Sequence, residues 1–157
     1  MKRTILYIGI LALVLAAPVK PMEIEKLRPV QIVSVYKKND WTVVETDTED
    51  IGIGTSVEQA VQNMKDTSGG VIYLDTAEYL LLTKETEETA ERLRAELKPS
   101  VGICLMTGVE DLQKAVLFLQ SHGELPKLKE WKKGRELPIL SSFGESFIFL
   151  KKVENKA

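Results

Sequence analysis

One cysteine and one histidine are the chain's only candidates for a thiol nucleophile and an imidazole base. A catalytic thiolate needs a base within reach and electropositive surroundings. Cys104, however, lies in an apolar run at residues 101–106, where a free cysteine usually packs as a small hydrophobic side chain. His122 precedes Gly123 at the expected end of a helix, where histidine commonly interacts with free carbonyl groups. The sequence therefore favours packing and helix termination, and it excludes an intrachain disulfide and a multi-histidine metal centre.

Two carboxylates, Asp75 and Glu78, flank a break between apolar stretches at residues 71–74 and 79–82. Paired carboxylates can perform general acid–base chemistry. No other pattern marks a cleft around them, and such residues more commonly cap a turn or interrupt a strand. A small exported hydrolase using Asp75 and Glu78 remains the alternative function, although no set of nucleophile, base and orienting group accompanies them.

An acidic stretch partly matches the calcium-binding loop, which needs oxygen ligands at its first, third and fifth positions, glycine at the sixth and glutamate at the twelfth. Asp47, Glu49, Gly52 and Glu58 fit this spacing. Ile51 occupies the fifth position and cannot coordinate a cation. The pattern therefore indicates a solvated acidic turn before a helix cap, and we predict no metal site.

Two glycines, Gly52 and Gly54, stand just before an expected helix, as glycines do in phosphate-binding loops. The dinucleotide fingerprint needs a third glycine, and the P-loop needs a Gly-Lys-Ser/Thr sequence. Neither is present. The two glycines are expected to permit a tight turn or a bulge, and we predict no cofactor.

A basic segment near the C-terminus surrounds one tryptophan. Trp131, Lys132, Lys133 and Arg135 could form a surface for an acidic partner or an anionic lipid, and aromatic residues and arginine are enriched at interfaces. The competing interpretation is a solvated basic face with Trp131 anchored in the core. We take these four residues as the candidate partner-binding site.

The clearest secondary-structure signal is a helix near the middle of the chain. Its apolar face is marked by residues at helical spacing: Val57, Ala60, Val61 and Met64. Capping-box spacings at residues 55–58 and 56–59 predict where it starts. One glycine of the pair Gly69-Gly70 is expected to end it in the left-handed region.

Strands and helices alternate after an opening β-hairpin. Strands are expected at residues 30–36, 41–46, 71–74, 101–106, 137–142 and 146–152, with 79–82 as a continuation or neighbour of 71–74, and further helices at 86–97 and 112–119. This order predicts an α/β (α+β) fold, a mixed sheet of about five to six strands with helices packed on it. The expected core comprises Val33, Val35, Val43, Val61, Met64, Ile72, Leu81, Leu93, Ile103, Leu112 and Val116.

The N-terminus carries a compartment signal. Lys2 and Arg3 precede an apolar run at residues 5–17, which is short for a membrane span of about 20 residues. Residues 1–17 are predicted to be a signal peptide or signal anchor, 18–29 a linker, 30–153 a single domain and 154–157 a frayed tail. The protein is expected to be exported and extracytoplasmic, with 5–17 as an alternative anchor. A net charge of −2 gives no reason to expect nucleic acid as a partner.

The element order, with GTSVEQAV at residues 54–61 and VIYL at 71–74, resembles the N-terminal domain of the spore germinant-receptor C subunit family. That resemblance covers about residues 30–107. It implies an extracytoplasmic protein that assembles with membrane subunits and has no catalytic residues. The predicted function is therefore an exported, non-enzymatic binding or accessory module of the cell envelope, with a membrane-protein partner and a possible connection to spore germination.

Overall fold

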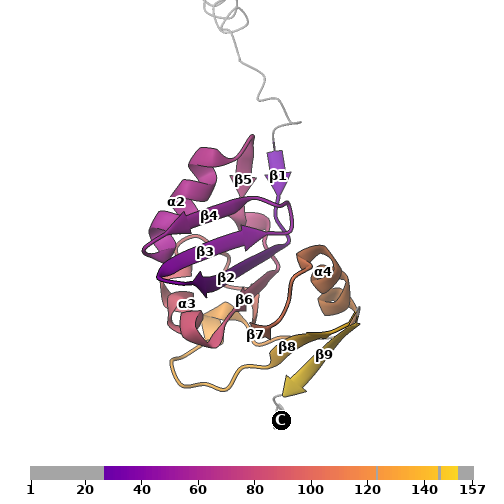
Figure 1. Cartoon of the computed structure of the whole chain (residues 1–157). Coiled ribbons are helices and arrows are strands. Elements are labelled where there is room, and N and C mark those ends of the chain that lie inside the picture. Colours follow the sequence, from indigo (N-terminus) through magenta and orange to yellow (C-terminus); the bar gives the residue numbers. More distant parts are fainter. Residues whose placement is uncertain (1–26, 123, 145, 152–157) are drawn as a thin grey trace, which may run out of the picture.

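The computed structural model describes residues 27–122, 124–144 and 146–151 (Figure 1). The predicted signal segment, most of the predicted linker and the predicted frayed tail lie outside the described residues. The strands are β1 (Leu27–Pro29), β2 (Ile32–Lys38), β3 (Trp41–Thr46), β4 (Ile51–Gly54), β5 (Val71–Tyr73), β6 (Tyr79–Leu82), β7 (Gly102–Thr107), β8 (Ile139–Phe143) and β9 (Ser146–Lys151). The helices are α2 (Val57–Thr67), α3 (Ala90–Leu93) and α4 (Leu112–Ser121), and the 3₁₀ helices are η2 (Leu74–Thr76), η3 (Lys84–Thr89) and η4 (Leu128–Glu130).

Seven of these strands form one mixed sheet in the order β4-β3-β2-β6-β7-β8-β9. Strands β2, β6, β7 and β8 pair in parallel, whereas β3, β4 and β9 are antiparallel to their neighbours. The predicted class, a mixed sheet with helices packed on it, is confirmed. The opening hairpin is also present, with Asn39 in the left-handed region at its two-residue turn (φ 55°).

A separate two-stranded sheet joins β1 to β5 in parallel. The end of the predicted linker is therefore strand β1. Residues 71–74 were expected to form a buried strand beside or continuous with residues 79–82, but β5 lies outside the main sheet. Thr76 explains the separation, because its hydroxyl hydrogen-bonds to both the N–H and the C=O of Val30 (2.9 Å each) and fixes the η2 turn between β5 and β6.

Helix α2 packs against the edge strand β4, and this contact explains the two glycines. Ser56 is the N-cap and accepts a hydrogen bond from the Gln59 N–H (3.3 Å), so the second of the two capping spacings is the one used. A Cβ atom on Gly54 would lie 2.6 Å from the Ala60 nitrogen, and one on Gly52 would lie 2.6 Å from Met64 Cβ. The segment expected to form a turn is therefore strand β4. Only glycine at positions 52 and 54 permits α2 to pack so closely on this strand.

The ends of three helices differ from the sequence expectations. Helix α2 ends before Ser68, which is extended (φ −63°, ψ 141°), and neither Gly69 nor Gly70 has a positive φ. The predicted helix at 86–97 begins instead as 3₁₀ helix η3 and has only one α-helical turn, α3. Helix α4 is capped by Asp111, which accepts a hydrogen bond from the Lys114 N–H (2.9 Å), and it ends at Ser121, two residues beyond the expected range 112–119.

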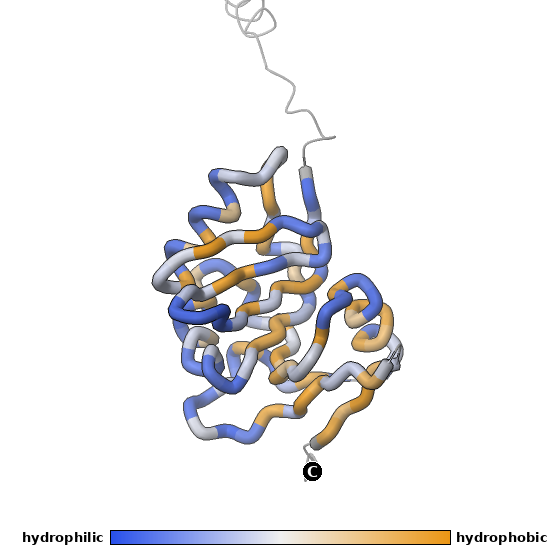
Figure 2. The backbone as a smooth tube through the Cα atoms, viewed as in Figure 1, coloured by the Kyte–Doolittle hydropathy of each residue, from blue (hydrophilic) through white to orange (hydrophobic). Residues whose placement is uncertain are grey.

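The two faces of the sheet carry separate apolar clusters. Helices α2 and α3 and the segment from Leu128 to Leu137 cover one face, while α4 covers the opposite face over β6, β7 and β8. Figure 2 shows the apolar residues concentrated along the strands and the inner sides of the helices. Every residue of the predicted core is buried, which confirms that list.

One part of the sheet has no helix across it in the described structure. In Figure 1 the faces of β3 and β4 that point away from α2 are open to the viewer. Trp41, Ile51 and Ile53 are each about half exposed there.

None of the helices in the described part of the chain combines the length and the apolar character that a membrane span requires.

Candidate functional site

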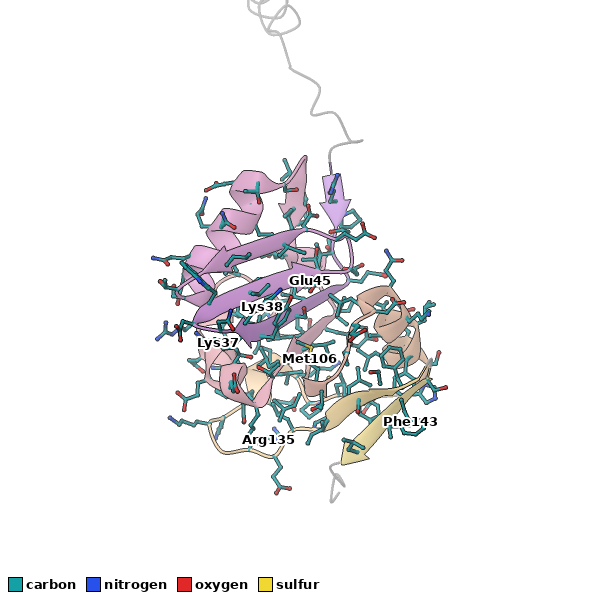
Figure 3. The ribbon with its side chains drawn as sticks, viewed as in Figure 1. Lys37, Lys38, Glu45, Met106, Arg135 and Phe143 are labelled. Atoms are coloured by element: carbon teal, nitrogen blue, oxygen red, sulfur yellow. The ribbon has the colours of Figure 1, made fainter. Side chains whose placement is uncertain are left out.

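A pocket of about 670 Å³ lies at the carboxyl ends of the parallel strands β2, β6 and β7. We call it the strand-end pocket. It is lined by Tyr36, Lys37, Glu45, Thr83, Lys84, Glu85, Met106, Thr107, Gly108, Val109 and Glu110. Figure 3 labels three of them, Lys37, Glu45 and Met106. In open sheets built from parallel strands, ligands characteristically bind just beyond the carboxyl ends of the strands.

The strand ends explain why these residues meet. Three β6 residues of the core are followed at once by the polar sequence Thr83-Lys84-Glu85, and β7 is followed by Gly108, which has a positive φ of 64°. Thr86 fixes the first bend, because its buried hydroxyl donates to the Val35 carbonyl (2.7 Å) and accepts from the Thr83 N–H (3.0 Å). The sequence interpretation missed this site. Polar residues directly after apolar strands were the available signal.

A tyrosine and a glutamate form the polar pair in the pocket. The Tyr36 hydroxyl donates to Glu45 Oε2 across the β2–β3 pair (3.1 Å). Burial raises the pKa of Tyr36, and the neighbouring Glu45 carboxylate raises that pKa further. Tyr36 is therefore a neutral hydrogen-bond donor at physiological pH, and Met106 supplies an almost buried apolar surface beside it.

A second hollow, of about 400 Å³, adjoins the strand-end pocket and shares Glu45 and Glu110 with it. We call it the acidic hollow. Its other lining residues are Thr46, Asp47, Glu49, Asp111, Leu112 and Gln113. Gln113 Nε2 donates to the Asp47 carbonyl (3.3 Å) and so ties the start of α4 to the β3–β4 turn. Carboxylates dominate the two hollows together, which favours a positively charged group near Glu45 and Glu110.

The titration of Tyr36 tests the pair directly. Glu45→Gln is expected to lower the pKa of Tyr36 while leaving it above the ordinary value of 10.0, because burial is the larger cause. An acid whose pKa is raised on folding binds its proton more tightly in the folded state, so the free energy of unfolding should fall as pH rises above about 10. Absorbance titration of wild type, Glu45→Gln and Tyr36→Phe measures the shift. An unchanged Tyr36 pKa in Glu45→Gln would contradict the pairing.

Cys104 and His122 are not brought together as a catalytic pair. Cys104 is fully buried in β7, and burial raises the pKa of its thiol. His122 is exposed at the end of α4, where Nδ1 lies 2.9 Å from the Phe118 carbonyl and the ring stacks on Phe118. Both sequence expectations, a packed cysteine and a histidine at the helix terminus, are confirmed.

Asp75 and Glu78 lie away from both hollows. Both side chains are exposed, Asp75 in η2 and Glu78 just before β6. Glu78 contributes its backbone, since its N–H donates to the Gln31 carbonyl (2.8 Å) and its carbonyl accepts from the Gly102 N–H (2.8 Å). Neither residue lines the strand-end pocket or the acidic hollow.

The candidate partner-binding residues are divided between core and surface. Trp131 is only 4% exposed and packs in the cluster under α2 and α3, which matches the competing interpretation of a core anchor. Lys132 is exposed, and Lys133 is exposed and lies 2.6 Å from Glu88. Arg135 donates to the Glu130 carbonyl (3.1 Å). Partner contact therefore remains a prediction only for the three basic residues.

The calcium-loop residues have other structural roles. Asp47 Oδ1 accepts from the N–H groups of Gln31 and Ile32 (2.9 and 3.0 Å), Gly52 faces α2, and Glu58 pairs with Arg92 (3.5 Å). Glu49 adopts a positive φ of 63° in the turn. Within the described ranges, no group of three acidic, cysteine or histidine side chains is arranged to hold a metal ion.

Comparisons with known proteins give no relative from which a role could be transferred. No protein-family model matches the chain, and neither the curated proteins nor the solved structures include a significant match.

Proposed function

We propose that the protein is a non-enzymatic binding module that holds a small ligand in the strand-end pocket. The observation that carries the proposal is the arrangement of Glu45 and Glu110, which border both hollows beside the apolar side chain of Met106. A concave site with an apolar lining and a few convergent polar groups is the usual form of a ligand site. The ligand we infer has a positively charged group and an apolar part.

The basic side chains of the pocket do not reverse this preference. Lys37, near the end of β2, is exposed. Lys84 is also mostly exposed and forms an ion pair with Glu87. The acidic hollow has no lysine or arginine in its lining. A cationic group placed between Glu45 and Glu110 would therefore meet two carboxylates, while an anion there would be repelled.

Alkyl amines of increasing chain length test the proposal, with alkyl carboxylates of the same lengths as matched probes. Amide chemical shifts in ¹⁵N-labelled protein should move at Thr83 and Gly108 when the amine is added, and affinity should rise with chain length as the apolar lining of the pocket, which includes Tyr36 and Val109, is covered. Glu45→Gln is expected to weaken amine binding about tenfold, because a hydrogen bond to a charged group contributes roughly 1.5–3 kcal/mol.

The control is Glu78→Gln. Glu78 is exposed and lies outside both hollows, and it neighbours Tyr79, whose pKa is raised by burial and by Glu78 in the way that the pKa of Tyr36 is raised by burial and by Glu45. This variant should leave amine binding unchanged. Equal binding of amines and carboxylates, or equal loss in Glu45→Gln and Glu78→Gln, would refute the proposed ligand class. Shifts confined to residues outside the pocket would refute the site.

We further propose that this module acts outside the cytoplasmic membrane as an accessory protein of the cell envelope, without catalytic chemistry of its own and comparable to the germinant-receptor C subunits it resembles. The charged start and apolar run at residues 5–17 support export. Cell fractionation with determination of the N-terminus tests it. A cytosolic protein that retains Met1 would overturn the proposed location without affecting the ligand site.

A further inference from the structure

The two edges of the main sheet are protected to different degrees. At β4 the backbone is covered by side chains of α2, since the Ile53 N–H donates to Asn63 Oδ1 (3.0 Å) and the neighbouring Thr55 N–H donates to Gln59 Oε1 (3.1 Å). Side chains or helices that occupy an edge prevent pairing with another strand. The β4 edge is therefore closed to strand addition.

The β9 edge has no such cover. Among the described residues, no side chain forms a comparable hydrogen bond to the β9 backbone. Ile148 and Leu150 on β9 are 44% and 58% exposed, and Phe143 on the adjacent strand β8 is 78% exposed. Figure 2 shows β9 as an apolar strand over most of its length, at the outer margin of the sheet. An exposed apolar edge strand of six residues is a template for pairing.

We propose that β9 pairs with β9 of a second copy of this chain, antiparallel about a two-fold axis at Ile148. The sequence around that residue is Phe147-Ile148-Phe149, which reads the same in both directions. A two-fold axis pairs a surface with itself, so it needs this kind of self-complementarity. The two seven-stranded sheets then become one continuous sheet.

Side-chain chemistry favours this register. Phe147 of each copy lies opposite Phe149 of the other, and Ile148 lies opposite Ile148. Aromatic and β-branched pairs across strands are the stabilising ones. Phe147 and Phe149 already lie 5.8 and 5.6 Å from the Phe118 ring, so the pairing joins two aromatic clusters into one.

The two-fold relation selects the direction of pairing. A two-fold axis through Ile148, perpendicular to the strands, reverses the second strand and brings Phe147 of each copy opposite Phe149 of the other. A second copy in antiparallel orientation is therefore the occupant that fits this edge.

Sedimentation velocity of the full chain over a concentration series tests the proposal. Wild type should dimerise, and Ile148→Lys, which places two like charges on the axis, should raise the dimer dissociation constant at least about tenfold. The matched control is Ile51→Lys, because Ile51 on the other edge strand is exposed to a similar degree (48%, against 44% for Ile148). Circular dichroism should show both variants folded.

Cysteine cross-linking gives a second measurement. Ile148→Cys should form an intermolecular disulfide under mild oxidation, since residues directly opposite in an antiparallel pair have Cα atoms about 4.5–5.5 Å apart, within the range of about 4.4–6.8 Å found in disulfides. Buried Cys104 should not react, and Ile51→Cys should remain uncross-linked. A monomeric wild type, a dimer that tolerates Ile148→Lys, or cross-linking through both introduced cysteines alike would each overturn the proposal.

Discussion

Alanine at Gly52 or Gly54 is expected to lower the free energy of unfolding by about 3 kcal/mol, at the upper end of the usual cost of overpacking. A Cβ on Gly54 would stand 2.6 Å from the Ala60 nitrogen, and one on Gly52 would be closer still to the Ala60 carbonyl. These obstacles are backbone atoms of α2, so a side-chain rotation cannot relieve them. The helix itself has to move away from β4, which loosens the packing of Met64.

Thermal unfolding measures this effect, with an expected fall of about 10 °C in Tm for each variant. Gly69→Ala is the matched control, because a Cβ there meets nothing closer than an Arg28 side-chain nitrogen at 3.6 Å and Gly69 does not have a positive φ. It should be close to neutral. A Tm for Gly52→Ala equal to that of Gly69→Ala would show that α2 does not pack as closely on β4 as described.

Trp131→Ala is expected to lower the free energy of unfolding by about 3–5 kcal/mol, the usual cost of removing a buried large aromatic side chain. Trp131 packs in the larger apolar cluster, and Arg94 Nη2 donates to its backbone carbonyl (2.6 Å). The chain's other tryptophan, Trp41, is 51% exposed, so Trp41→Ala should cost far less.

A third substitution, Trp131→Phe, distinguishes the loss of side-chain volume from the loss of the indole N–H group. Trp131 Nε1 is buried and has no hydrogen-bond partner in the described part of the chain. Trp131→Phe removes this unpaired donor while keeping an aromatic ring, so it should destabilise less than Trp131→Ala. Urea unfolding followed by circular dichroism measures all three variants. Equal stability of Trp131→Ala and Trp41→Ala would contradict the burial of Trp131.

This result bears on any test of the basic segment as a partner surface. A loss of partner recovery in Trp131→Ala would report unfolding rather than a lost contact. Lys132→Glu and Lys133→Glu are the appropriate variants, since both side chains are exposed. Undiminished recovery from solubilised membranes with this pair of substitutions would rule out the segment as the contact surface.

Periodic patterns predicted the helices whose apolar faces pack on the sheet, and they failed where the backbone depends on distant contacts. The spacing of Val57, Ala60, Val61 and Met64 is a local property, and that face is buried. Strand β4, in contrast, looked like a turn because of its two glycines. Those glycines are required by the approach of α2, which no local pattern reveals.

The strand-end pocket could not be found from sequence for a related reason. Tyr36, Glu45, Thr83 and Glu110 are ordinary residues in four separate segments, and they meet only because β2, β6 and β7 are neighbours in the sheet. The sequence showed where each strand ends but not the strand order. The burial of Cys104 and the position of His122 at the end of α4 could be predicted, because both follow from local context.

The strand order also has a consequence for how the chain folds. Strands β2, β3 and β4 form a meander with α2 directly behind it in the sequence, so this unit closes through short loops. The parallel pairing of β2 with β6 joins Ile32 to Tyr79 and needs the intervening chain to be organised first. Because non-local parallel pairing is slow, insertion of β6 beside β2 should be the rate-limiting step. Substitutions in the β2–β6 contact, such as Val33→Ala, would then slow refolding. Substitutions in the β8–β9 hairpin, which we expect to pair with β7 only after that step, would mainly speed unfolding.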